Sequence, residues 1–269
     1  MRTGVLQSSG ACLIALTMFC APAAAQGTAA GARTTARLPR TADGKPNLQG
    51  IWQVQNRAAY DLLDHNARPG LPAGEGVVEG GEIPYQPAAA VTKAENFANR
   101  LTADPLVRCD MPGVPRIMYL NYAFQIFQTP THVAVTFEWS QLHRLIYTNG
   151  TKPPTGIDFW MGDSRGHWEG DTLVVEVTNH NDRTWLDASG DFHSDALRVT
   201  ERYTLVDADT IRYEATIEDP NVFTRPWKIT MPFYRQMALR RLPEYQCAAE
   251  LEEGTGAFVR DPRTWAPGQ

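Results

Sequence analysis

The chain of 269 residues has little cysteine, with four residues in total, of which Cys12 and Cys20 lie close to its start. Only Cys109 and Cys247 remain in the body of the chain, so a zinc site built from cysteine ligands is excluded. Beyond the first 25 residues the sequence contains no apolar run long enough to span a bilayer. The formal net charge is −5 at pH 7 and no basic stripe occurs, which argues against nucleic acid as a partner.

Recognised catalytic and cofactor motifs are also missing from the sequence. No serine stands in a Gly-x-Ser-x-Gly elbow, and no glycine-rich phosphate loop follows a predicted strand. We therefore expect no cofactor and no metal. A mixed site is the alternative that the residue types leave open, with two nitrogen and two oxygen ligands from His180, Asp182, His193 and Glu201.

The first residues are typical of a secretory signal. Arg2 is followed by an apolar stretch and by Ala23-Ala24-Ala25, a small-residue cleavage site, so residues 1–25 are predicted to be a signal peptide. We expect a periplasmic or secreted protein, with a flexible lead-in at residues 26–42 and a C-terminal tail at 251–269. In an exported protein the pair Cys109 and Cys247 indicates a disulfide, and two buried free thiols are the alternative.

Alternation of apolar and polar residues predicts an all-β fold. We expect eight to ten strands joined mostly by short turns in a single domain at residues 43–250, because such a meander closes into a barrel or a sandwich. Residues 88–101 lack helix breakers and are predicted to form a helical insertion. The predicted later strands lie at 121–128, 133–139, 142–148, 167–178 with an internal turn, 197–206, 211–218, 227–234 and 237–247.

The step Gly50-Ile51-Trp52 follows a turn-rich entry and opens a short predicted strand. It resembles the Gly-x-Trp step that begins the first strand of lipocalin-like barrels, where the indole closes one end. The resemblance implies a lipocalin-like antiparallel barrel. An eight-stranded barrel of this kind has room for side chains or for one small ligand.

Longer stretches carry a second resemblance, namely Arg108-Cys109, Pro112 to Arg116, Trp160 to Ser164, His167 to Val175, Asn181-Asp182, Thr184 to Asp187, His193-Ser194, Glu201-Arg202, Glu218 to Pro220 and Pro226-Trp227. They are similar to a family of uncharacterised exported bacterial proteins that is numerous in soil bacteria. The resemblance implies an exported, lipocalin-like β domain and brings no reaction with it.

Glu201 is the strongest candidate for chemistry, because it occupies the apolar face of a predicted strand. Leu197, Val199, Tyr203 and Leu205 share that face. A carboxylate among apolar neighbours is paired, protonated or used in catalysis. The functional interpretation makes Glu201 an acid or base, and the structural one pairs it with an arginine such as Arg225.

His193 and Asp187 complete the predicted catalytic set. A histidine at the mouth of a barrel is suited to act as base or acid at neutral pH, and Asp187 would orient its imidazole. The alternatives are a histidine bonded to backbone and aspartates that serve only as turn residues. The residues expected to contact a ligand are Trp185, Tyr203, Asp182, Trp139 and Arg202.

These residues favour an exported, cofactor-independent enzyme, a lyase, isomerase or hydrolase, that uses acid/base chemistry on a small apolar or aromatic molecule. The alternative is a periplasmic carrier of a similar ligand without catalysis, and a third interpretation is a structural domain with a filled barrel. The enzyme requires an open cavity that Glu201 and His193 both reach. The carrier requires a cavity lined almost wholly by apolar groups and a Glu201 held by an arginine, and the structural domain requires that no cavity is large enough for a ligand. Nothing in the sequence predicts the oligomeric state.

Overall fold

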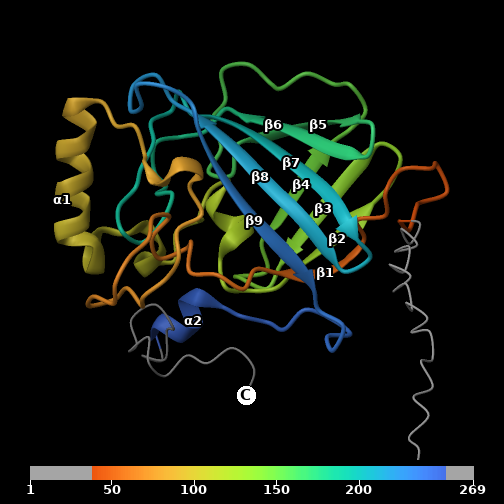
Figure 1. Ribbon diagram of the computed structural model, residues 1–269, viewed down its shortest axis with the longest axis horizontal. Helices are drawn as coiled ribbons and strands as arrows, with labels where there is room; N and C mark the ends of the chain where they lie inside the picture. Colours follow the sequence, from red (N-terminus) through yellow and green to blue (C-terminus); the bar gives the residue numbers. More distant parts are fainter. Residues whose placement is uncertain (1–37, 253–269) are drawn as a thin grey trace, which may run out of the picture. The chain divides into compact units, whose positions relative to one another are not determined.

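The computed structural model describes residues 38–252, in which nine strands form one closed barrel (Figure 1). Each strand pairs with the next along the chain, and β9 pairs with β1; β4 and β5 run parallel, and the other pairs are antiparallel. The predicted all-β barrel with a helical insertion is confirmed, with one parallel contact in place of a fully antiparallel sheet. The strands are β1 (Gly50–Gln53), β2 (Phe124–Gln128), β3 (His132–Phe137), β4 (His143–Tyr147), β5 (Asp163–Glu169), β6 (Thr172–Thr178), β7 (Arg198–Asp207), β8 (Thr210–Glu218) and β9 (Trp227–Arg235).

Alternating side chains decide which face of each strand turns inward. In β7 the buried residues are Val199, Glu201, Tyr203 and Leu205, with more exposed residues between them. A period of two places these side chains on the interior face of the barrel. Glu201 therefore lies inside the barrel, as its position in the sequence predicts.

Trp52 of the Gly-Ile-Trp step lies in β1 and is fully buried. Its indole Nε1 donates a hydrogen bond to the carbonyl oxygen of Leu48 at 2.9 Å, and the guanidinium carbon of Arg235 lies 4.2 Å from the ring centroid. A buried indole is most stable when its N–H has a partner. Trp52 thus anchors the entry to the first strand.

The connection between β1 and β2 holds α1 (Pro87–Ala103) and the 3-10 helices η1 (Glu79–Gly81), η2 (Pro105–Arg108) and η3 (Arg116–Tyr119). Proline at the first position of α1 suits a helix start, because that residue needs no amide hydrogen. Figure 1 shows α1 apart from the strands, and Ala89 is its buried residue. Contacts with the irregular segments therefore hold α1 in place.

Cys109 and Cys247 form a disulfide, as predicted, with their Cα atoms 5.5 Å apart. The bond ties the insertion to α2 (Cys247–Glu252). The predicted strand at 237–247 is wrong, because turns and bends precede α2. Pro243 has no amide hydrogen for a strand ladder, and Tyr245 makes only an isolated bridge with Trp139.

Part of the predicted termini lies outside the described residues, namely the signal peptide at 1–25, residues 26–37 of the lead-in, and residues 253–269 of the tail. The rest of the lead-in lies against the barrel, because Arg40 donates to both carboxylate oxygens of Asp171 at 2.9 and 2.6 Å. Within residues 38–252, no helix combines the length and the hydropathy needed to cross a membrane.

Candidate functional site

Glu201 is fully buried inside the barrel and is held by Arg144 of β4. Arg144 Nη1 donates to Glu201 Oε1 at 3.0 Å, and Nη2 donates to Oε2. The hydroxyls of Tyr203 and Tyr213 each donate to Oε1 at 2.9 Å, and Arg144 Nε donates to Ser164 Oγ at 2.9 Å. Both charges are therefore neutralised and hydrogen-bonded, which is the condition for a stable buried ion pair.

This ion pair does not provide the open cavity that the catalytic interpretation requires. Both oxygens of Glu201 accept hydrogen bonds from the chain, and no part of the residue is exposed. The predicted partner is also wrong, because Arg225 lies 3.8 Å from Glu82 at the surface. Among the described residues Glu201 therefore has the contacts of a structural ion pair.

His193, in the connection between β6 and β7, is also closed off, with 3 % of its surface exposed. Its Nε2 lies 2.6 Å from Thr184 Oγ1, and its Nδ1 lies 2.9 Å from the carbonyl oxygen of Ser194. Burial lowers the pKa of the imidazole, although the Ser194 carbonyl opposes the shift. Both ring nitrogens have partners within the chain. The prediction that His193 is open to a ligand at the mouth of the barrel is therefore wrong.

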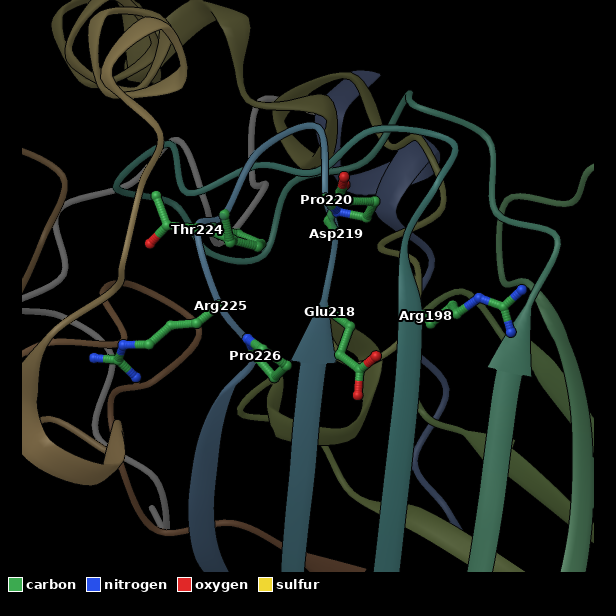
Figure 2. Close-up of a pocket in the computed structure, with 8 residues that line it drawn as sticks. Arg198, Glu218, Asp219, Pro220, Thr224, Arg225 and Pro226 are labelled. Atoms are coloured by element: carbon green, nitrogen blue, oxygen red, sulfur yellow. The ribbon is translucent and has the colours of Figure 1, made fainter.

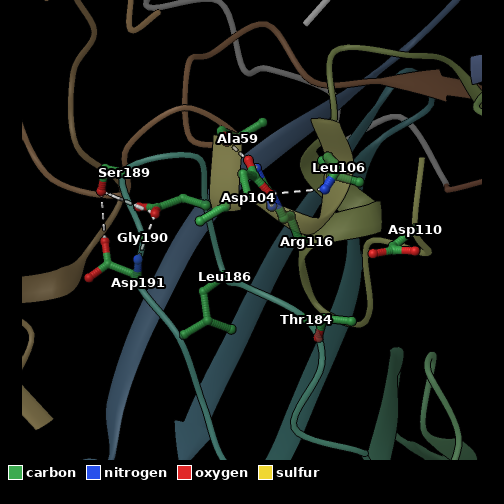
Figure 3. A network of polar contacts seen from close by, with 12 residues as sticks. Ala59, Asp104, Leu106, Asp110, Arg116, Thr184, Leu186, Ser189, Gly190 and Asp191 are labelled. Atoms are coloured by element: carbon green, nitrogen blue, oxygen red, sulfur yellow. Dashed lines mark hydrogen bonds and ion pairs between the residues drawn. The ribbon is translucent and has the colours of Figure 1, made fainter. Parts of the chain in front are cut away.

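Asp187 is fully buried, and the predicted contact with His193 is wrong. Asp187 Oδ2 accepts from the backbone N–H of Leu62 at 2.9 Å, and Oδ1 accepts from the N–H of Asp191 at 3.0 Å. Ser189 Oγ lies 3.1 Å from both Asp187 oxygens. It also lies 3.1 Å from Asp191 Oδ2 (Figure 3). Asp187 therefore joins the turn at residues 187–191 to the segment that follows β1.

Lys93 of α1 brings a positive charge to this turn. Its Nζ lies 2.9 Å from Asp191 Oδ2 and 2.6 Å from Ser189 Oγ, and Tyr85 donates to Asp191 Oδ1 at 2.6 Å. Burial alone would raise the pKa of Asp191, but Lys93 and hydrogen bonds from Asp187 and Tyr85 bring it below its ordinary value. Burial, reinforced by the charge of Asp191, raises the pKa of Asp187 well above its ordinary value. The cluster fastens α1 to the turn.

Asp61, Asp187 and Asp191 are a group of described residues whose oxygen atoms lie close enough to share a cation, within 4.8 Å of one another. Carboxylate oxygens suit a hard cation such as Mg²⁺ or Ca²⁺. Here the ammonium of Lys93 contacts Asp191 directly, so the chain itself supplies the positive charge. We assign these carboxylates a role in holding the insertion and no metal.

His180 follows β6 and is fully buried, and neither ring nitrogen has a hydrogen-bond partner among residues 38–252. Its ring centroid lies 5.8 Å from that of His193. Burial, together with the charges of His193 and Arg144, lowers the pKa of His180 to about 3. The mixed metal site considered from the sequence is not assembled, because Arg144 holds Glu201 and Asp182 is exposed.

His180 predicts a definite pH dependence of stability. Its pKa is lower in the folded protein than in the unfolded chain, so its contribution is favourable above about pH 6.5 and is lost as the pH falls. Between pH 7 and pH 4.5 we expect His180 to lower the free energy of unfolding by about 2–3 kcal/mol. His180→Leu should remove this loss without breaking a hydrogen bond, so the variant should exceed the parent in stability at about pH 4.5. Urea unfolding at both pH values measures the difference.

His143 is the matched control, because it lies on β4 with an exposed side chain. His143→Leu should leave the pH dependence of unfolding as in the parent. A His180→Leu variant that loses stability in parallel with the parent over this range would contradict the assignment of His180 as a buried neutral imidazole.

Two of the predicted ligand contacts lie in the core. Tyr203 is buried, and its hydroxyl is bound to Glu201. Trp139 has 1 % of its surface exposed, and its ring packs against Tyr122 and Tyr245 with centroids 5.3 and 5.0 Å apart. Both side chains fill space in the structure.

The other three predicted contacts lie nearer the surface. Trp185 is half-buried and makes an isolated backbone bridge with Phe192, whereas Asp182 is exposed. Arg202 faces outward, where its Nη2 lies 2.9 Å from Glu169 Oε2. Arg202 follows the inward-facing Glu201, and successive side chains of a strand point to opposite faces of the sheet. Its guanidinium therefore cannot contact a ligand inside the barrel.

A cleft of about 320 Å³ lies at the end of the barrel where β7 begins and β8 ends (Figure 2). Its walls come from the start of β7 and from the connection between β8 and β9. Pro220, Phe223 and Pro226 supply apolar surface, and Arg198 and Arg225 lie on two sides with guanidinium groups directed outward (Figure 2). This volume lies within the range of small-molecule sites.

The charged groups of the cleft differ in how strongly they are engaged. Arg198 is exposed and stands opposite Glu218 in the β7–β8 register, yet no ion pair of Arg198 is found among residues 38–252. Asp219 is buried, and it accepts from Ser194 N at 2.6 Å, Ser194 Oγ at 2.9 Å and Asn221 N at 3.0 Å. The Arg198 guanidinium points away from the cleft (Figure 2), but it is exposed and has no ion pair among these residues, so it is free to turn toward a ligand, whereas Asp219 stabilises the loop.

The insertion fixes the wall of the cleft. Gln86 N donates to the carbonyl oxygen of Val222 at 2.9 Å, and Thr224 N donates to that of Pro84 at 2.8 Å. The ring of Tyr85 lies 5.2 Å from that of Phe223. The segment leading into α1 therefore holds the connection between β8 and β9, so the cleft has a preformed wall.

None of the residues that line this cleft was predicted from the sequence to be a site residue. The available signal was Phe223, an apolar residue between Pro220 and Pro226 in a connection between two strands. Prolines mark a rigid loop but carry no information on whether the loop encloses a hollow.

A search against protein-family models gave no match, and none was obtained among curated proteins.

Proposed function

We propose that the protein is an exported carrier of a small aromatic molecule, which it binds without catalysis in the cleft at the end of the barrel. Export is proposed from the signal-like residues 1–25, and the disulfide between Cys109 and Cys247 agrees with an oxidising compartment. The cleft, with its apolar surface and with Arg198 at its rim, is the observation that carries the proposal.

The apolar part of the cleft favours a flat, unsaturated ligand. Pro220 and Pro226 are exposed, and Phe223 packs behind them against Trp227. Transfer of apolar ligand surface from water to such a wall is favourable at about 25 cal/mol per Å². A ring with a hydrogen-bond-accepting group would place that group near Arg198, whose guanidinium binds carboxylates in a planar, two-bond geometry.

The surroundings of the acid/base residues favour a carrier over an enzyme. Glu201 and Asp187 are fully buried and bonded to other parts of the chain, and both nitrogens of His193 have partners. A general acid or base must reach the proton that it moves. The three residues predicted to be catalytic therefore support the barrel and the insertion in this proposal.

The test uses 2-naphthoate as the probe and isothermal titration calorimetry as the measurement. Arg198→Ala should weaken binding about threefold to tenfold, because it removes a solvent-accessible ion pair with the carboxylate. The uncharged analogue 2-naphthamide should bind the parent and Arg198→Ala with similar Kd, since it has no charge for the arginine to recognise.

Arg202→Ala is the matched control, because Arg202 lies on the same outer face of β7 and is bound to Glu169. This variant should keep the Kd of the parent for 2-naphthoate. An equal loss of affinity for 2-naphthoate in both variants would show that only the general surface charge matters. The absence of 2-naphthoate binding to the parent would refute the proposed ligand class.

A further inference from the structure

Glu218, the last residue of β8, places a negatively charged group in the cleft. Its side chain is exposed and lines the cleft directly. Among residues 38–252 neither an ion pair nor a side-chain hydrogen bond of Glu218 is found, although Arg198 stands across from it on β7. The cleft therefore contains a carboxylate that the chain leaves without a partner, next to an arginine in the same condition.

A cation, an anion and an apolar surface follow one another across the cleft. Arg198 stands opposite Glu218, and on the next strand Trp227 pairs with Ile217. Pro226 precedes Trp227 and therefore lies next to Glu218. Figure 2 shows Glu218 between Pro226 and Arg198. Opposed residues of neighbouring strands have Cβ atoms about 4.5–5.5 Å apart, so one small molecule can reach all three side chains.

This order of charges is a poor match for a ligand whose only charge is a carboxylate. Glu218 repels the carboxylate that Arg198 attracts, and like charges placed together weaken binding. An ammonium group beside the carboxylate of the ligand would turn this repulsion into an attraction. In an aromatic α-amino acid one carbon carries both charged groups, and the ring is attached through the next carbon. Its carboxylate, ammonium and ring therefore have the same order as Arg198, Glu218 and Pro226.

We propose that the ligand is an aromatic α-amino acid in its zwitterionic form and that Glu218 binds its ammonium group. The inference rests on the proposed function and narrows its ligand class. Arg198 turns toward the cleft and binds the carboxylate, while the ring lies against the apolar surface of Pro220 and Pro226. Glu218 is thus a residue that determines specificity, because it favours a ligand with an ammonium group over the same ligand without one.

The experiment compares 3-(2-naphthyl)-L-alanine with 3-(2-naphthyl)propanoate, which has the same ring and carboxylate but no ammonium group. In calorimetry at pH 7 the parent should bind the amino acid about threefold to fivefold more tightly, which is the contribution of an exposed ion pair. Glu218→Gln should weaken binding of the amino acid and strengthen binding of the propanoate, because it removes both the attraction and the repulsion. A change in the shape of the cleft would affect both ligands in the same direction.

Glu214→Gln is the matched control. Glu214 lies on the same outer face of β8 as Glu218, is bound to Arg212 and Lys228, and is not among the residues that line the cleft. This variant should keep the preference of the parent for the amino acid. An equal loss of that preference in both glutamine variants, or its retention in Glu218→Gln, would overturn the role of Glu218.

The affinities of the parent separate failure of the inference from failure of the proposed function. A parent that binds 2-naphthoate but shows no preference for 3-(2-naphthyl)-L-alanine over 3-(2-naphthyl)propanoate would overturn the inference and leave the carrier in place. A parent that binds none of the three ligands would overturn the inference together with the proposed function.

Discussion

Arg144→Met should lower the free energy of unfolding by about 3–5 kcal/mol, since it leaves the carboxylate of Glu201 buried and without a counter-charge. Glu201 is fully buried, and its remaining partners are the hydroxyls of Tyr203 and Tyr213. Hydroxyl groups stabilise a carboxylate but do not neutralise it. For a domain of this size the loss corresponds to a decrease in Tm of roughly 6–20 °C. Thermal unfolding followed by circular dichroism measures it.

The double variant Arg144→Met/Glu201→Gln separates loss of charge balance from loss of packing. The new glutamine side chain would remain an acceptor for the two tyrosine hydroxyls and would carry no charge, so the double variant should recover at least half of the lost stability. Glu201→Gln alone should be destabilised about as much as Arg144→Met. Retention of full stability by Glu201→Gln would contradict the structural interpretation of the pair.

Arg202→Met is the control for these measurements. Arg202 also pairs with a glutamate, but both side chains are partly exposed, at 38 % for Arg202 and 50 % for Glu169. Exposed ion pairs contribute about 0–1 kcal/mol, because water and salt screen them. A loss from Arg202→Met equal to that from Arg144→Met would show that burial of the Arg144 pair has no special effect.

The second large effect should follow removal of the disulfide. Cys109 and Cys247 are separated by 138 positions in the sequence, so their bond restricts the unfolded chain over a long loop. Replacing both residues by alanine should lower the free energy of unfolding by about 2–5 kcal/mol. Urea denaturation of the parent and the double alanine variant, both without reductant, measures the difference.

Reductant provides the control for the disulfide. Dithiothreitol should lower the urea midpoint of the parent to near that of the alanine variant, and it should not change the variant itself. An unchanged midpoint of the parent after verified reduction would show that the bond contributes nothing to stability.

The strands were predictable because their apolar faces repeat every second residue. The pair at 197–206 and 211–218 is observed as β7 (Arg198–Asp207) and β8 (Thr210–Glu218), joined by a tight turn. The predicted helix at 88–101 is observed as α1 (Pro87–Ala103). Such patterns are local, so a single sequence contains them. The parallel contact of β4 with β5 depends on the closure of the whole barrel and has no local signal.

The partner of Glu201 was not predictable for a related reason. Arg144 and Glu201 are 57 residues apart, and they meet because β4 and β7 both turn these positions inward. Alternation identifies an inward charge but not which strand supplies its counter-charge. Asp187 was misinterpreted in the same way, because Leu62, which binds Asp187, and Lys93, which binds Asp191 in the same turn, both belong to the insertion between β1 and β2.

The most direct test of the account is the Kd of the double variant Arg144→Met/Glu201→Gln for 2-naphthoate, measured under conditions where the variant is folded. We expect a Kd within about twofold of the parent, because the ligand binds at the end of the barrel and the ion pair only supports the interior. A folded double variant that no longer binds 2-naphthoate would contradict the account and would indicate that the ligand binds inside the barrel.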